Sequence, residues 1–320
     1  LLGRDGRRKH AERLAERKPG GKVRPWKEYV AWGKELFLTC QVTQPPEGPA
    51  PSKPISEHYK CTHCHNNRRE DRSLTVQDPE DRVAYIEASK PGDAPFLLQT
   101  GTTMWGAVNR ESFYNDSYAP YHTLPVAGGK PMNPRSLEDS TQVCCTYCSV
   151  GRLATDWEID ALLAYFWELE VRLTDLELPE GVERSLAATL AATGADRDPK
   201  AVNQARAMLQ RLYLRAAGDA YTAPPKQLEA KSAGPYPDKA KYQGEPKVGE
   251  KLYKLACDQC HGEGKPHESA GADLLRDVRR YHLILSSGTH QDKEPYMPMF
   301  TSQRLSRQQI ADIEAYLRTL

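Results

Sequence analysis

The runs Cys61-Thr-His-Cys64-His65 and Cys257-Asp-Gln-Cys260-His261 decide what this chain of 320 residues can be. In each run, two cysteines three positions apart can form thioethers to one haem, and the histidine that follows can ligate the iron. The composition predicts only about 0.006 such motifs by chance. We therefore expect two covalently bound haem c groups, attached through Cys61, Cys64, Cys257 and Cys260, with His65 and His261 as proximal iron ligands.

Two other chemistries use the same residue types. The two Cys-x-x-Cys pairs can together bind a structural zinc ion, because thiolates also suit zinc. The pairs lie almost two hundred residues apart, and each is followed at once by histidine, which favours haem. A thioredoxin-like redox pair fits less well, since no βαβ pattern surrounds either motif.

Matching segments flank the two motifs. Upstream, Gly33-Lys-Glu-Leu-Phe resembles Gly249-Glu-Lys-Leu-Tyr, and downstream the segments that end at Tyr165 and Tyr316 resemble each other. Each segment has the apolar spacing of an amphipathic helix. The chain thus resembles a class I cytochrome c domain twice, and in that family an N-terminal and a C-terminal helix cross around the haem. The resemblance implies an all-α fold with two cytochrome c domains.

These landmarks divide the chain into parts. We expect residues 25–172 to form an elaborated cytochrome c domain with the first motif, and residues 245–320 a compact one with the second. Residues 173–244 join them as a helical segment followed by an extended Pro-rich linker. Within these parts, Thr155 and Pro199 are expected to begin helices.

Residues 1–24 carry nine Lys or Arg against three acidic side chains. We expect a solvated basic arm that can contact a membrane surface or a partner in a larger complex. The net charge of the whole chain is +1, which gives no argument for nucleic-acid binding. No run approaches the roughly 18 apolar residues of a membrane span.

The distal iron ligand of the second domain is expected in Tyr296-Met297-Pro298-Met299-Phe300, which resembles the Met-Pro loop of cytochromes c. Met297 is the expected ligand and Met299 the fallback. A 151-residue offset aligns Tyr165 with Tyr316, and it maps this loop onto the run Cys144-Cys145-Thr-Tyr-Cys148. The first domain therefore has cysteines where the second has methionines.

A thiolate ligand lowers the potential of a haem iron and can support chemistry. We expect Cys148 to ligate the first haem, with Met132 and Cys145 as alternatives and with Met104 and His122 as weaker ones. A third haem at Cys145 and Cys148 lacks the histidine that would follow them. We also expect Cys40 to form a disulfide with one of the three clustered cysteines.

Two functions remain open. The first is a dihaem cytochrome that transfers electrons between redox proteins. The second is an enzyme that oxidises a sulfur compound at a Cys-ligated first haem, a hypothesis that rests on a weaker similarity to thiosulfate dehydrogenases and SoxA-type cytochromes. Its candidate catalytic residues are Cys148 and Arg152, and Arg110 and Tyr114 are expected near the haem edge. Haem attachment of this kind takes place outside the cytoplasm in bacteria, so the resemblance implies a periplasmic protein, free or membrane-associated.

Overall fold

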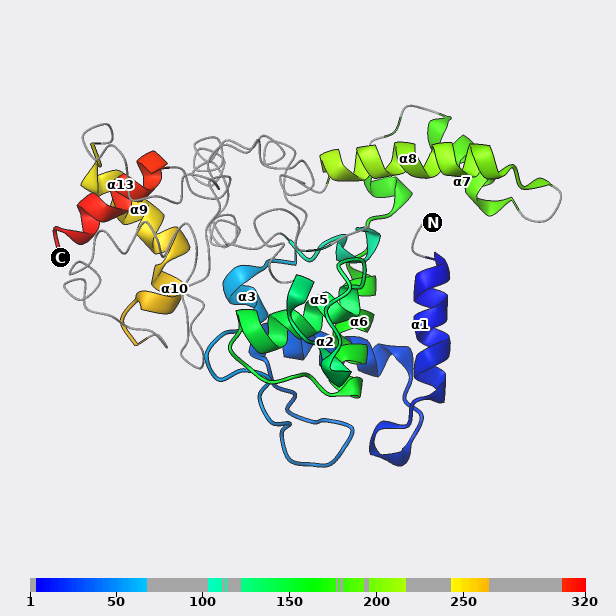
Figure 1. Cartoon of the computed structure of the whole chain (residues 1–320), viewed down its shortest axis with the longest axis horizontal. Helices are drawn as coiled ribbons and strands as arrows, with labels where there is room; N and C mark the ends of the chain where they lie inside the picture. Colours follow the sequence, from blue (N-terminus) through cyan, green and yellow to red (C-terminus); the bar gives the residue numbers. More distant parts are fainter. Residues whose placement is uncertain are drawn as a thin grey trace.

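The computed structural model is helical in the part of the chain that it describes, which confirms the all-α prediction (Figure 1). The β pairing within that part is one isolated bridge between Pro125 and Pro131. None of its helices is both long enough and apolar enough to cross a membrane. The structure describes residues 4–67, 103–110, 113, 122–176, 178, 181–192, 196–216, 243–264 and 307–320.

Two pairs of packed helices dominate the architecture. In the first unit, α2 (Trp26–Thr39) packs along α6 (Asp156–Glu168). In the second unit, α9 (Pro246–Ala256) packs along α13 (Arg307–Leu317) (Figure 1). Each pair joins a helix that precedes a Cys-x-x-Cys-His motif to a helix far downstream of it.

Each pair crosses at a glycine. A Cβ atom added to Gly33 would overlap the backbone oxygen of Ala161, and one added to Gly249 would overlap that of Asp312. Ala161 and Asp312 are related by the same 151-residue offset that aligns the two downstream segments. The crossings are therefore equivalent, and both depend on a residue without a side chain, because only glycine lets the backbones approach so closely.

The residues three and four positions after each glycine complete the crossing. Two leucines at the first of these positions are fully buried: Leu36 and Leu252. At the next position, Phe37 packs on Tyr165 with ring centroids 5.7 Å apart. Tyr253 packs on Tyr316 at 5.6 Å, with a similar tilt between the rings. Tilted aromatic pairs of this kind stabilise a core beyond the area that they bury.

We expect Gly33→Ala and Gly249→Ala each to lower the free energy of unfolding of their unit by about 2 kcal/mol or more, because the added methyl group forces the helices apart. Denaturant unfolding monitored by circular dichroism measures the loss. Gly48→Ala is the matched control, since nothing lies within 4 Å of its added Cβ. An equal effect of all three substitutions would contradict the role of the crossings.

The helix α6 begins where the sequence predicts. Thr155 is its N-cap, and both its backbone N–H and its hydroxyl donate to the carboxylate of Glu158, at 2.8 and 3.0 Å. This reciprocal capping box satisfies donors that the first turn of a helix leaves free. Every residue from Trp157 to Phe166 is buried, so α6 is the central helix of the first unit.

The basic N-terminal segment is not the solvated arm that we expected. Residues Arg4–Glu16 form α1, which runs beside α6 (Figure 1) and buries Leu14 in the core of the first unit. Two arginines of α1 and one just after it pair with acidic residues on or near α6. The pairs are Arg7 with Glu168 and Glu170, Arg13 with Glu138 and Asp160, and Arg17 with Asp156 and Asp160. The local charge pattern could not show this, because the matching carboxylates follow more than a hundred residues later.

Asp160 is the centre of this docking, and its side chain is buried. Arg13 donates to its Oδ1 atom at 2.7 Å, and the Nε atom of Arg17 lies 3.3 Å from Oδ2. His10, which packs edge-on against Trp26, has its Nε2 atom 3.5 Å from Oδ1. A buried carboxylate needs such counter-charges, so the position of α1 depends on Asp160.

Asp160→Asn should lower the free energy of unfolding by about 2 kcal/mol, because Arg13 and Arg17 would keep their charges beside a neutral group. The loss is smaller than for a fully buried pair, since both arginines are partly exposed. Limited trypsin digestion should also cut α1 faster. Glu12→Gln is the control, because its pair with Arg8 is exposed and contributes little. Equal behaviour of the two variants would contradict the docking role.

The described residues of the segment expected to be helical contain two helices, α7 (Val182–Ala191) and α8 (Pro199–Ala216), and α8 begins at the predicted proline. Leu186 and Ala205 pack with Val171 and Leu176, which follow α6. Other short elements in the described part of the chain are η1 (Pro19–Gly21), η4 (Ala107–Asn109), η6 (Ala127–Gly129), α5 (Leu137–Val143), η7 (Cys144–Cys148) and η8 (Leu173–Asp175).

Candidate functional site

The first motif forms one helical turn, α3 (Cys61–Cys64), after which His65 adopts extended backbone. The N–H of His65 still donates to the carbonyl of Cys61 at 2.8 Å. Neither cysteine forms a disulfide, both have intermediate exposure, and a three-residue spacing on a helix puts them on one face. Two thiols on one face with an imidazole directly after them fit a covalently attached haem.

The second motif follows α9 without a break. Cys257 ends that helix, α10 (Asp258–His261) follows, and the N–H of His261 donates to the carbonyl of Cys257 at 2.9 Å. The Cys260 side chain lies outside the described part of the structure. Cys257 is buried and forms no disulfide. The backbone of this motif therefore has the same single turn as the first, with the histidine at its end.

A tyrosine hydroxyl is hydrogen-bonded within the second motif, and another just after the first. The hydroxyl of Tyr253 donates to the carbonyl of His261 at 3.3 Å, and burial raises the pKa of Tyr253 to about 12. In the first unit, the amide of Asn67 donates to the hydroxyl of Tyr165 at 2.7 Å. Burial also raises the pKa of Tyr165. Both phenols therefore stay protonated at neutral pH.

Cys40 ends α2 in the left-handed region, with φ of 60°, and lies beside the first motif. Its thiol donates to the carbonyl of Tyr59 at 3.2 Å and is hydrogen-bonded to the thiol of Cys61. That bond lowers the pKa of Cys40 and raises the pKa of Cys61 well above its usual value. Sequence reasoning missed this contact, because nothing in the sequence marks Cys40 for a left-handed conformation.

The clustered cysteines form a turn of π-helix, η7 (Cys144–Cys148), which continues α5. Such turns are rare and occur often at functional sites. The thiols of Cys144 and Cys148 are hydrogen-bonded to each other, and this bond, together with burial, raises the pKa of Cys144 well above its usual value. Cys61 packs against the core cluster that contains Cys145, so the π-helical turn lies close to the first motif.

The expected disulfide between Cys40 and one of these cysteines is not formed. None of the cysteines whose side chains the structure describes is in a disulfide, and the Cys40 thiol is hydrogen-bonded to the Cys61 thiol instead. In the same described part, no group of three or more His, Cys, Asp or Glu side chains is arranged to hold a metal ion.

The three candidate distal ligands of the first unit separate into two environments. Cys145 lies in the main core of that unit, and its pKa is raised, chiefly by burial. Cys148 and Met132 instead share a smaller apolar cluster with Val126 and Val143. The structure therefore brings together the expected ligand and its methionine alternative, and it separates Cys145 from both.

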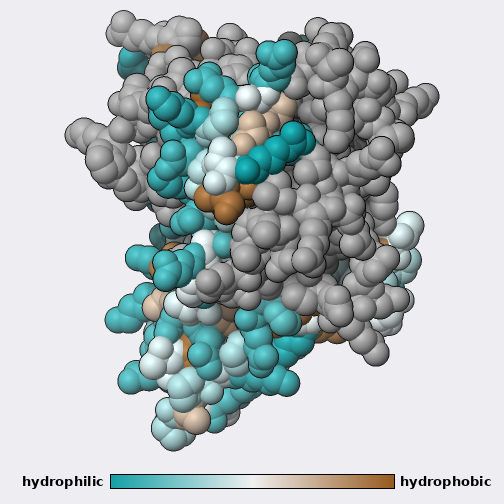
Figure 2. All heavy atoms as spheres, turned by 90° about the vertical axis from the view of Figure 1, so that its left-hand side faces the viewer, coloured by the Kyte–Doolittle hydropathy of each residue, from teal (hydrophilic) through white to brown (hydrophobic). Residues whose placement is uncertain are grey.

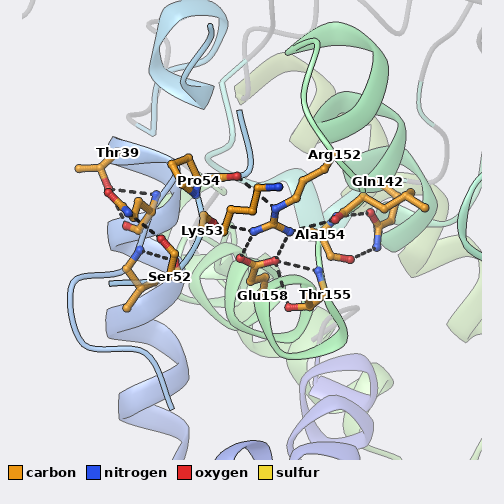
Figure 3. Close-up of polar contacts among 12 residues, drawn as sticks. Thr39, Ser52, Lys53, Pro54, Gln142, Arg152, Ala154, Thr155 and Glu158 are labelled. Carbon is orange, nitrogen blue, oxygen red and sulfur yellow. Dashed lines mark hydrogen bonds and ion pairs between the residues drawn. The ribbon is translucent and has the colours of Figure 1, made fainter. Parts of the chain in front are cut away.

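Arg152 is held on all five of its N–H donors by protein oxygens (Figure 3). Two donors bind the carboxylate of Glu158, at 2.6 and 2.8 Å. The other three bind the carbonyls of Lys53, Pro54 and Leu153. The guanidinium thus clamps the loop before the first motif onto α6. No donor is left to bind an anion, which does not support a catalytic role for Arg152.

The clamp and the π-helical turn are neighbours in the structure. The backbone N–H of Arg152 donates to the carbonyl of Ile55, and that of Gly151 donates to the carbonyl of Cys145. A Cβ atom on Gly151 would overlap both of these acceptor oxygens. Close backbone packing therefore fixes the turn that carries Cys148 against the loop that leads to Cys61.

Arg152→Lys should lower the free energy of unfolding by about 2 kcal/mol, because an ammonium cannot replace a two-pronged bond to the buried Glu158 carboxylate. The haem content should not change. Lys53→Ala is the control, since Lys53 contributes only its backbone carbonyl to the clamp. Thermal unfolding of purified protein measures both. Loss of a sulfur-oxidising activity at unchanged stability would contradict this structural role.

Of the other candidate residues, three contact protein groups in the described part of the chain and three lie outside it. Arg110 donates to the carbonyl of Thr103 at 2.7 Å, and Met104 packs against the main core near Cys61. The Nε2 atom of His122 lies 3.1 Å from the carbonyl oxygen of Phe113. Three further candidates lie outside the described residues: Met297, Met299 and Tyr114.

Comparison with known proteins identifies one region. Residues 244–317 match the family model of cytochrome c oxidase, cbb3-type, subunit III. This region is a cytochrome c domain. It contains α9, α10 and α13, and therefore the second motif and its helix crossing. The chain thus contains a cytochrome c domain, which implies covalently bound haem c and supports an electron-transfer function. No curated protein and no solved structure matches the chain.

Proposed function

We propose that this cytochrome carries two haem c groups and transfers electrons between redox proteins in the periplasm, alone or as a subunit of a larger complex. The observation that carries the proposal is the equivalence of the two units. The matched domain places Gly249 against Asp312, and the first unit places Gly33 against Ala161 at equivalent positions. A Cys-x-x-Cys-His motif accompanies each crossing.

The domain division that we predicted belongs to this proposal. The first unit, within residues 25–172, would hold one haem through Cys61, Cys64 and His65. The second, within residues 245–320, would hold the other through Cys257, Cys260 and His261. A haem iron gains or loses one electron, and enclosure in a packed helical unit limits rearrangement around it when its charge changes.

Distal ligation distinguishes the two units in this proposal. Met297 would ligate the second haem, and His/Met ligation raises its potential. Cys148 would ligate the first and lower its potential, with Met132 as the alternative from the same apolar cluster. Cys145 is the weaker alternative, because it packs in the main core rather than with these two residues.

The hydrogen bonds of Arg152 favour electron transfer over sulfur oxidation. Oxidation of an anionic sulfur compound needs a cationic group free to bind it, and all five donors of Arg152 bind the protein. The enzymatic alternative keeps one observation in its favour, the π-helical turn of cysteines beside the first motif. The proposed electron donor and acceptor are therefore other redox proteins.

The face that includes the second unit gives a surface suited to transient protein contacts. Among its described residues, hydrophilic side chains predominate, and hydrophobic ones form only small patches (Figure 2). Transient redox complexes use such polar, modest surfaces. Contact of the N-terminal segment with a membrane or a larger complex also stays a proposal, although docking of α1 uses several of its arginines.

Haem content and EPR test this proposal. A pyridine haemochrome assay should give two haems for each chain, and one after Cys61→Ala combined with Cys64→Ala. The oxidised protein should give a low-spin thiolate EPR signal from one haem, which Cys148→Ser removes and Cys145→Ser and Met132→Leu retain. One haem in the unaltered protein would overturn the dihaem proposal. Absence of a thiolate signal from the unaltered protein, together with a His/Met signal that Met132→Leu removes, would make methionine the ligand.

Addition of a sulfur compound separates the two functions. Thiosulfate mixed with the oxidised protein under anaerobic conditions should leave the haem spectrum unchanged, whereas a reduced small redox protein should reduce both haems. Rapid reduction by thiosulfate, abolished by Cys148→Ser, would instead support the sulfur-oxidising alternative.

A further inference from the structure

At each helix crossing a tyrosine hydroxyl is hydrogen-bonded to the proximal histidine or to a residue just after it, but the tyrosines lie on opposite helices. In the first unit, Tyr165 on α6 accepts a hydrogen bond of 2.7 Å from the side chain of Asn67, which follows His65 by two residues. In the second unit, Tyr253 on α9 donates a hydrogen bond of 3.3 Å to the carbonyl of His261 itself. The crossings are equivalent, yet the hydroxyl comes from the downstream helix in one and from the upstream helix in the other.

In each aromatic pair one ring supplies the hydroxyl that is hydrogen-bonded to the histidine segment, and that ring lies on opposite helices in the two units. Phe37 occupies the position that corresponds to Tyr253, and it has no hydroxyl. Tyr316 corresponds to Tyr165, and its hydroxyl has no hydrogen bond to any residue in the described part of the chain. Each aromatic pair therefore supplies one hydrogen bond to the segment that carries the proximal histidine.

We propose that Tyr165 and Tyr253 are positioning residues that fix the proximal histidines His65 and His261 relative to the helix crossings. The inference for Tyr253 requires only the haem of the cytochrome c domain. The inference for Tyr165 also rests on the proposed function, because it requires a haem in the first unit.

The physical basis is clearest in the second unit. Packing on Tyr316 holds the ring of Tyr253, which is buried and lies one helical turn after the contact between Gly249 and Asp312. The backbone of His261 is then bound on both sides, since its N–H donates to Cys257 at 2.9 Å and its carbonyl accepts from the phenol. With both backbone groups of His261 held, the Cα atom from which its imidazole projects has little freedom to move.

In the first unit the tether acts through a side chain. Tyr165 binds Asn67, and the preceding residue, Asn66, is buried and accepts at its carbonyl from the N–H of Met104 at 2.7 Å. The segment after His65 is therefore bound to α6 on one side and to the inserted residues 103–110 on the other. Loss of the phenol leaves only the second of these attachments.

The experiment compares Tyr253→Phe with Tyr316→Phe in the full, haem-loaded chain. Each variant removes one hydroxyl from the same aromatic pair, but only the first removes the tether. In Tyr253→Phe the amides of His261 and Gly262 should exchange hydrogen about fivefold faster, the factor expected for a net hydrogen bond. The largest EPR g value of the second haem should also shift. Neither change should occur in Tyr316→Phe.

Tyr165→Phe tests the first unit in the same way. It should speed exchange of the His65 amide and shift the signal of the first haem, with the second haem unchanged. Identical EPR spectra and exchange rates in Tyr253→Phe and Tyr316→Phe would overturn the positioning role. Haem content separates the two proposals: one haem in the unaltered chain overturns the dihaem function, and the test on Tyr253 still stands.

Discussion

The close backbone contact at a glycine is the constraint on which both units depend. Gly33 against Ala161, and Gly249 against Asp312, set how near two helices can lie. The leucine and the aromatic residue that follow each glycine then meet the opposite helix at a fixed depth. In the second unit α9 runs directly into the Cys-x-x-Cys-His motif, so its crossing also sets where that motif begins. Packing at one point in each unit therefore controls the geometry of the site.

In the first unit, two buried carboxylates also pair with arginines, and no such pair occurs in the described residues of the second unit. Glu158 binds Arg152 and the N-cap Thr155, and Asp160 binds arginines from the N-terminal segment. These two buried carboxylates hold, respectively, the loop before the first motif and helix α1. Ion pairs thus hold the segments that are added to the first unit, whereas close packing holds its helix crossing.

Much of this fold was readable from residue patterns, and what was not has identifiable causes. The motifs, the glycine-led segments and the capping threonine are local signals, and helices formed at each of them. The docking of α1 was not predictable, because the carboxylates that pair with Arg13 and Arg17 lie far away in sequence. The contact between Cys40 and Cys61 also required a left-handed backbone at a residue with no preference for one. Likewise, the sequence drew attention to Arg152 as a reactive cation, and only the fold showed its five occupied donors.

The two acidic positions on α6 have a consequence for how relatives of this chain can vary. At the corresponding positions of α13 stand Gln309 and Ala311, which carry no charge. Glu158 is therefore free to change only together with Arg152, and Asp160 only together with Arg13 and Arg17. In an alignment of related sequences these positions would covary across long distances, while their counterparts on α13 would drift independently. Such a pattern would record which half of the chain acquired its charged attachments after the two halves diverged.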